Sequence, residues 1–174
     1  DDPDWLGATS VALVGQFTVS RANGIKIPAS VKQIHGFNQA KITITDFVYN
    51  PTTAKGGLWY DELPTTPDYS IRDLEVDCTG DLSSGFRNCT NLTNCTGTGT
   101  GSAGSGFVGC TNLTNCTGSG IGTESSGYGF SGCSNLTNCT GTGTGTEGYG
   151  YGFSGCSNLT NCTGTGTGGT NGYG

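Results

Sequence analysis

A segment repeated four times at a nearly constant interval restricts what this chain can fold into. The segment, Phe-x-x-Cys-x-Asn-Leu-Thr-Asn-Cys-Thr-Gly, begins at Phe86, Phe107, Phe130 and Phe153, so successive copies are 21, 23 and 23 residues apart. A stretch rich in Gly, Thr and Ser completes each copy. A fixed period of this length is typical of a solenoid, in which each repeat forms one coil and buries its apolar face against its neighbours.

The residues before the repeats favour β-strands as well. Stretches rich in β-branched and aromatic residues predict strands at 9–20, 24–28, 31–34, 41–49, 58–60 and 69–80, separated by turn-forming Gly and Pro. Apolar residues nowhere recur at helical spacing over a useful length. The sequence therefore predicts an all-β repeat solenoid with coils of about 23 residues.

Two regions are expected along this solenoid. Residues 1–72 form an irregular β region, interpreted as wider coils, and residues 73–174 form thin coils rich in Cys, Asn, Gly and Thr. Because Ile71, Leu74 and Val76 lead into the repeats without a linker, both regions are expected to share one solenoid. A separate small β-domain over residues 1–70 is the alternative. The start at Asp1 suggests a mature or excised fragment, and the last coil is expected to need a covering element.

Equivalent residues of successive copies are expected to stack as ladders about 4.8 Å apart, the spacing of neighbouring strands. Buried cysteine behaves as a small hydrophobe, so the cysteines are interpreted as inward and mostly reduced. Disulfides between coils and a metal site are the alternatives. Asp77-Cys78-Thr79-Gly80 matches Asn94-Cys95-Thr96-Gly97, which predicts that Cys78 precedes Cys95 in its ladder. The predicted ladders are Phe86, Phe107, Phe130 and Phe153; Cys89, Cys110, Cys133 and Cys156; Leu92, Leu113, Leu136 and Leu159; and Cys95, Cys116, Cys139 and Cys162.

Two asparagine ladders are predicted beside them. An amide both donates and accepts, so identical stacked amides can satisfy one another. Nine overlapping Asn-x-Thr sequons occur in the repeats and fit ladders better than glycan sites. The ladders comprise Asn91, Asn112, Asn135 and Asn158, and Asn94, Asn115, Asn138 and Asn161.

The Gly/Thr runs predict a thin coil with a hydroxyl-rich surface. If Cys139 points inward, period-two alternation places Gly141, Gly143 and Gly145 inward and the intervening threonines outward. Such flat arrays resemble the faces of ice-binding solenoids. The predicted surface array is Thr140, Thr142, Thr144, Thr163, Thr165 and Thr167.

The repeat resembles a shortened rung of the right-handed parallel β-helix of pectate-lyase-like proteins and phage tailspikes. The phrases Ala40-Lys-Ile-Thr-Ile-Thr-Asp-Phe and Tyr69-Ser-Ile-Arg-Asp-Leu-Glu-Val-Asp-Cys resemble rungs of that family too. The resemblance implies asparagine ladders along the turns. Phe-x-x-Cys-x-x-Leu is also similar to bacterial surface-type leucine-rich repeats, although the Ile-x-Ile-Pro strand of that family is replaced here by Cys-Thr-Gly-Thr.

Charge is concentrated in the first half of the chain. The net charge is −6, every Lys and Arg lies at or before Arg87, and only Glu124 and Glu147 are charged beyond it. This distribution argues against nucleic acid as a partner, and no apolar run is long enough for membrane insertion.

Candidate chemistry is sparse. Asp73, Glu75 and Asp77 alternate along one expected strand, and glycoside hydrolysis requires a pair of carboxylates. Asp61 and Glu62 adjoin Trp59 and Tyr60, a combination that could form a sugar-binding cleft. A solvated face and packed aromatics explain these residues more simply. With one histidine in the chain, His35, a zinc site is not favoured. We therefore expect no catalytic residue, no cofactor and no metal.

The sequence thus favours a non-enzymatic structural or adhesive fibre segment of a phage tail fibre or tailspike involved in host attachment. Its expected location is extracellular or in a virion. A cell-surface or self-assembling extracellular filament protein and an ice-binding β-solenoid are the alternatives. The expected partners are further copies of the chain, in a trimer or a head-to-tail filament, and a cell-surface glycan or protein receptor.

Overall fold

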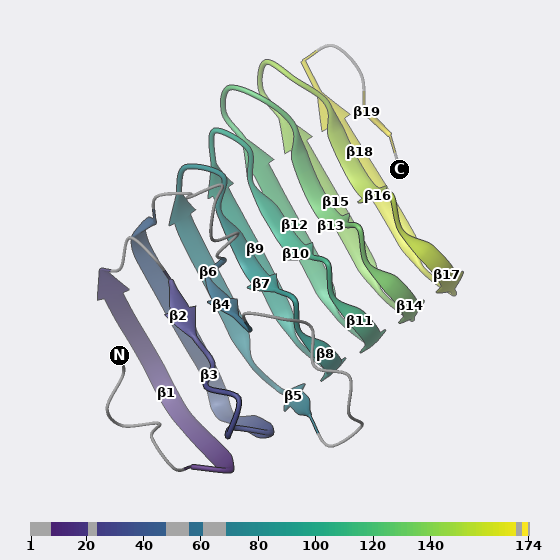
Figure 1. The fold of residues 1–174 in the computed structure, drawn as a ribbon. Helices are drawn as coiled ribbons and strands as arrows, with labels where there is room; N and C mark the ends of the chain where they lie inside the picture. The colour runs from purple at the N-terminus through teal and green to yellow at the C-terminus, as the bar shows by residue number, and fades with distance from the viewer. Residues whose placement is uncertain (1–7, 21–23, 48–55, 61–68, 170–171, 174) are drawn as a thin grey trace.

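The chain winds into a coil whose walls are parallel β-strands (Figure 1). The computed structural model describes residues 8–20, 24–47, 56–60, 69–169 and 172–173. These ranges contain no helix, and they form a parallel β-solenoid of about six turns with roughly 23-residue spacing. The predicted all-β repeat solenoid is confirmed.

Nineteen strands make up the described part of the coil. From β7 to β18 each strand has only four to six residues, whereas β1 and β3 are longer. The strands are β1 (Ser10–Ser20), β2 (Ile25–Lys26), β3 (Gln33–Phe47), β4 (Leu58–Trp59), β5 (Ser70–Arg72), β6 (Glu75–Gly80), β7 (Ser84–Arg87), β8 (Thr90–Thr93), β9 (Thr96–Gly101), β10 (Ser105–Val108), β11 (Thr111–Thr114), β12 (Thr117–Gly122), β13 (Gly127–Ser131), β14 (Ser134–Thr137), β15 (Thr140–Gly145), β16 (Gly150–Ser154), β17 (Ser157–Thr160), β18 (Thr163–Gly168) and β19 (Gly172–Tyr173).

Three faces run along the coil. Face 1 is the seven-stranded sheet β2-β4-β7-β10-β13-β16-β19. Faces 2 and 3 belong to one twelve-stranded sheet, because the long strand β3 lies in both. Its residues Gln33–His35 pair with β5, the start of face 2 (β5, β8, β11, β14, β17). Its residues from Lys41 onward pair with β6, the start of face 3 (β6, β9, β12, β15, β18).

The strands of the first half therefore lie in the same sheets as the repeats. β1 pairs in parallel with both halves of β3, and β2 and β4 begin face 1. The strands expected at 31–34 and 41–49 are joined in one strand, β3, over residues 33–47, because Gly36 does not turn the chain; residues 48 and 49 lie outside the described residues. The bend occurs at Asn38 and Gln39, whose φ angles of 52° and 58° are left-handed.

A left-handed residue at every third position bends each thin coil around its core. In the first repeat Asn88, Asn91 and Asn94 have φ angles of 51°, 54° and 53°. Asparagine tolerates this conformation better than most residues with a side chain. Each of these asparagines directly precedes an inward residue, so the core positions recur every three residues. The inward residues of this arc are Phe86, Cys89, Leu92 and Cys95.

Past this arc the inward period changes from three to two, and the inward residues become glycines. A Cβ on Gly143 would lie 2.2 Å from the Tyr151 carbonyl oxygen and 2.4 Å from that of Gly127. Gly97, Gly118 and Gly120 are obstructed by the backbone of face 1 in the same way. Faces 1 and 3 are thus in direct backbone contact, and the predicted inward placement of glycine in a thin coil is confirmed.

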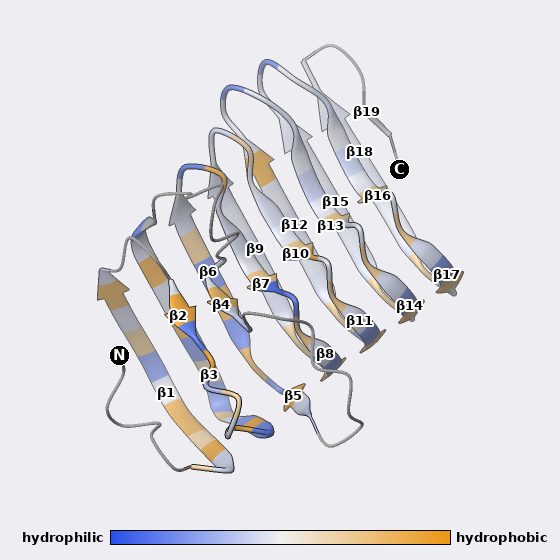
Figure 2. Cartoon of the chain, viewed as in Figure 1, coloured by the Kyte–Doolittle hydropathy of each residue, from blue (hydrophilic) through white to orange (hydrophobic). Residues whose placement is uncertain are grey.

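The coils nearer the N-terminus are wider because apolar side chains separate their walls. Ile42 and Ile44 of β3, and Val76 of β6, are buried at positions in register with later glycines. Figure 2 shows this change as alternating orange and blue strands giving way to pale ones along face 3. Cys78 belongs to this wide region, since it pairs with Gly99.

The prediction that Cys78 precedes Cys95 in its ladder is therefore wrong. Leu74 occupies that position, because the Leu74 carbonyl accepts a hydrogen bond from the Thr96 backbone N–H, next to Cys95. Asp73, with a left-handed φ of 54°, takes the place that Asp77 was expected to share with the asparagines. The tetrapeptide match was misleading because three residues of β6, 75–77, lie between the end of the arc at Leu74 and Cys78.

Candidate functional site

The most regular exposed surface among the described residues lies on face 3. The outward residues of β9, β12, β15 and β18 form three columns of four, and ten of the twelve are threonines. We call this surface the threonine face. It comprises Thr96, Thr98, Thr100, Thr117, Ser119, Ile121, Thr140, Thr142, Thr144, Thr163, Thr165 and Thr167.

Strand register aligns these columns without interruption. Thr98 pairs with Ser119, Ser119 with Thr142, and Thr142 with Thr165, and no bulge occurs between these four strands. Neighbours therefore lie about 4.8 Å apart across strands and roughly 6.8 Å apart along a strand. The face is a two-dimensional lattice of side chains.

The chemistry of the threonine face is uniform. All twelve side chains are exposed or half-buried, and none carries a charge. Threonine presents one methyl and one hydroxyl group and is stiff about χ1, so its groups are held in few orientations. The strands beneath cannot shift inward, because their glycines already contact face 1. The surface is therefore flat, uncharged and rigid.

A group of charged residues bounds the threonine face on its N-terminal side. Lys41 Nζ lies 2.8 Å from Glu75 Oε1 and 2.5 Å from Asp77 Oδ2. Hydrogen bonds to Asp77 and then to Glu75 raise the pKa of Lys41 above its ordinary value. Asp77 is in register with Thr98, so charge stops one strand before the face begins.

The three carboxylates considered for catalysis contact three different residues. Asp73 Oδ2 lies 2.9 Å from His35 Nε2, and Asp73 Oδ1 accepts from Asn94 Nδ2 at 3.0 Å. Glu75 and Asp77 instead share Lys41. Each carboxylate thus has a structural partner.

The aromatic residues considered as a sugar platform are inside the molecule. Trp59 and Tyr60 are buried, and the Tyr60 hydroxyl donates to the Val31 carbonyl at 3.2 Å. Tyr60 also packs edge-on against Tyr69, with ring centroids 5.5 Å apart. Asp61 and Glu62 lie outside the described residues.

The predicted phenylalanine and leucine positions stack in register on faces 1 and 2. The rings of Phe86, Phe107, Phe130 and Phe153 are nearly parallel, with successive centroids 5.0, 4.8 and 5.0 Å apart. Leu92, Leu113, Leu136 and Leu159 pair in order, and the first three are fully buried.

The asparagine positions form hydrogen-bonded columns with one direction. Asn112, Asn135 and Asn158 each donate from Nδ2 to Oδ1 of the preceding asparagine, at 3.0, 3.0 and 2.9 Å. The second column runs from Asn138 through Asn115 to Asn94 at 3.3 Å per step. It ends on Oδ1 of the Asp73 carboxylate, which only accepts hydrogen bonds and therefore terminates the column. Asn161, the last predicted member, is exposed on the final described coil.

The cysteines of both predicted ladders point into the coil. All nine thiols are free; Cys156 and Cys162 are half-buried, and the other seven are buried. Burial raises the pKa of Cys78 to about 12 and raises that of Cys110 well above its usual range. The Cys78 and Cys110 thiols are therefore protonated near neutral pH and act as small apolar fillers. No group of three or more potential metal ligands occurs in the described ranges.

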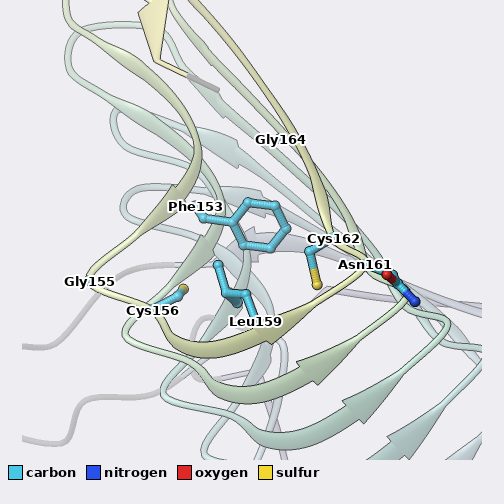
Figure 3. A pocket seen from close by; sticks show the side chains of 7 residues that line it. All are labelled: Phe153, Gly155, Cys156, Leu159, Asn161, Cys162 and Gly164. Atoms are coloured by element: carbon cyan, nitrogen blue, oxygen red, sulfur yellow. The ribbon is translucent and has the colours of Figure 1, made fainter.

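The last described coil exposes its core. Phe153, Cys156, Leu159 and Cys162 line a hollow at this end (Figure 3), and Leu159 is 44% exposed although its counterpart Leu136 is fully buried. β17 and β18 are the outermost strands of faces 2 and 3 here, and within the described part of the chain only β19 continues the next turn.

These features define the chain as a parallel β-solenoid protein with one regular hydroxyl-rich face. No family model, curated protein or solved structure matches it. The described ranges contain no helix, and so no helix that is long and apolar enough to span a membrane.

The sequence reasoning found only half of the threonine face. It named the outward threonines of β15 and β18 but not the six matching positions of β9 and β12. The signal was available, because residues 96–101 and 117–122 alternate with glycine in the same way.

Proposed function

We propose that this chain is a non-enzymatic segment of an adhesive fibre, of the right-handed β-helical kind used in phage tail fibres and tailspikes, and that it serves host attachment. The observation that carries the proposal is the unbroken parallel pairing from β1 to β18. A continuous stack of this sort resists bending and can hold a binding surface away from its point of attachment.

The interior supports a mechanical role. Stacked phenylalanines fill the arc of the thin coils, and inward glycines bring the backbones of faces 1 and 3 into contact, while hydrogen-bonded amide columns connect the coils on the outside. The hollow lined by Phe153 and Leu159 is the exposed end of the core, and no His, Asp, Glu, Lys or Arg is among the residues that line it. The exterior of the thin coils offers hydroxyl and amide groups for contact with a surface glycan or protein receptor.

A second candidate is a cell-surface or self-assembling extracellular filament protein. The exposed leucine and cysteine positions of the last described coil favour it, because another coil of the same kind would bury them. That coil could come from the same polypeptide or from a further copy in a trimer or head-to-tail filament.

Electron microscopy and cell binding test these proposals together. We expect the 174-residue chain to form straight rods, and fluorescently labelled rods to decorate a subset of bacterial strains in a panel. Rods that lengthen with protein concentration and bind no cells would favour the filament. Globular particles without binding would refute both.

A further inference from the structure

The threonine face has the properties of a receptor for a ligand that is itself periodic in two directions. Its columns repeat about every 4.8 Å across strands and roughly every 6.8 Å along them. Twelve positions in register are far more than one sugar or one peptide strand could contact in the same way. We infer that this face binds ice.

The side chains suit ordered water. Each hydroxyl both donates and accepts a hydrogen bond, as each water molecule does, and each threonine adds a methyl group of fixed size beside its hydroxyl. Ile121 lacks the hydroxyl but keeps the β-branched methyl, so it interrupts hydrogen bonding at one site without projecting a charge. The prism plane of hexagonal ice repeats on a similar scale in two perpendicular directions.

Rigidity strengthens the inference. Ordering a mobile surface on binding costs free energy, whereas a preorganised one avoids much of that cost. Here the glycines behind Thr142 and Thr144 contact face 1, so the threonines are fixed from beneath. Charged groups on this sheet stop at Asp77 and do not enter the face.

Other ligands fit less well. An anionic polymer would find no cation on the threonine face. A glycan would be expected to stack on aromatic rings, but the outward stacked pair Tyr128 and Tyr151 lies on face 1. Crystalline polysaccharide shares the two-dimensional order of ice and is therefore the competitor to test.

The test compares two lysine substitutions in exposed threonines of different faces. Thr142→Lys places a long charged side chain in the central column of the threonine face, and Thr114→Lys places the same group on face 2. We expect the full chain to show thermal hysteresis and to inhibit ice recrystallisation. T142K should lose most of both activities, and T114K should retain them. Equal melting temperatures would establish that both variants are folded.

Results of two kinds would overturn the inference. One is wild-type protein that gives no more hysteresis than an unrelated protein at equal concentration, or T142K that remains fully active. The other is binding to microcrystalline cellulose or chitin that T142K abolishes, without activity on ice. Rods in the electron microscope without ice activity would refute this inference and leave the fibre proposal standing.

Discussion

Replacing Gly143 with alanine tests whether faces 1 and 3 are in backbone contact. The added Cβ would lie 2.2 Å from the Tyr151 carbonyl oxygen, 2.4 Å from that of Gly127 and 2.4 Å from the Tyr151 nitrogen. Side-chain Cβ atoms essentially never approach other atoms within 3.0 Å. Strand β15 must therefore move away from face 1 by about 0.8 Å, because no obstructing atom belongs to a rotatable side chain.

The cost follows from overpacking against fixed atoms. Inserting a methyl group into a well-packed core destabilises a protein by about 1–3 kcal/mol. Alanine also restricts the unfolded chain, which offsets about 0.4–1 kcal/mol. Since three backbone atoms obstruct the group, the overpacking cost should lie at the upper limit, and we expect a net loss of about 2 kcal/mol or more.

Urea unfolding followed by circular dichroism measures this loss, and hydrogen exchange with mass spectrometry shows whether β15 and β16 open first. Gly132→Asn is the matched control. A Cβ at residue 132 meets nothing within 4 Å, and Asn88 holds the equivalent position with a φ of 51°. We expect G132N to lie within about 0.5 kcal/mol of the wild type. A similarly small effect of Gly143→Ala would refute the backbone contact.

Three further predictions concern the core, the amide columns and the thiols. Leu136→Asp should destabilise by about 4 kcal/mol or more and Thr142→Asp by less than about 0.5 kcal/mol, and similar melting shifts would contradict the inside–outside assignment. Asn135→Gly removes two side-chain hydrogen bonds, but glycine adopts the left-handed φ of 57° readily, so this variant should be destabilised by about 1–2 kcal/mol. Asn135→Ala loses the same hydrogen bonds and also strains the backbone, so it should be about 1 kcal/mol less stable than Asn135→Gly. Equal stability of the two variants would show that backbone strain is unimportant at this position. Burial raises the folded-state pKa of Cys78 and Cys110, so each thiol keeps its proton in the folded state at a pH where the unfolded chain has lost it. The free energy of unfolding should therefore be unaffected by these thiols below the unfolded thiol pKa of about 8.5, and should decrease above it by up to about 1.4 kcal/mol per pH unit for each thiol. Urea midpoints from pH 7 to 10 check this, and a flat profile would contradict it.

The solenoid and its core positions could be predicted because the repeat reports both period and stacking. Identical residues 21 or 23 positions apart must occupy equivalent places if coils stack, and this reasoning placed Phe107 and Leu113 without further information. It failed where the coil changes width. Cys78 has the same neighbours in sequence as Cys95, but the arc before it includes Leu74, and only the strand register distinguishes the two.

The candidate site was harder to predict, because its definition depends on which strands lie side by side. Thr98 and Thr142 are far apart in the chain, and one column connects them only when Ser119 is recognised as an equivalent of threonine. The single continuous strand β3 could not be foreseen either. Left-handed Asn38 and Gln39 let one strand serve two faces, and no local composition distinguishes that bend from a turn.

The in-register stacking of neighbouring coils also bears on how the length of this protein can change in evolution. Residues 130–145 and 153–168 are identical in sequence, and β13–β15 pair with β16–β18 at equivalent positions throughout. Unequal recombination between the corresponding gene segments would add or delete a whole coil while leaving each joint as it was. The molecule would then lengthen or shorten in steps of about 4.8 Å. The length of the solenoid could thus differ between related genes while the fold stayed the same.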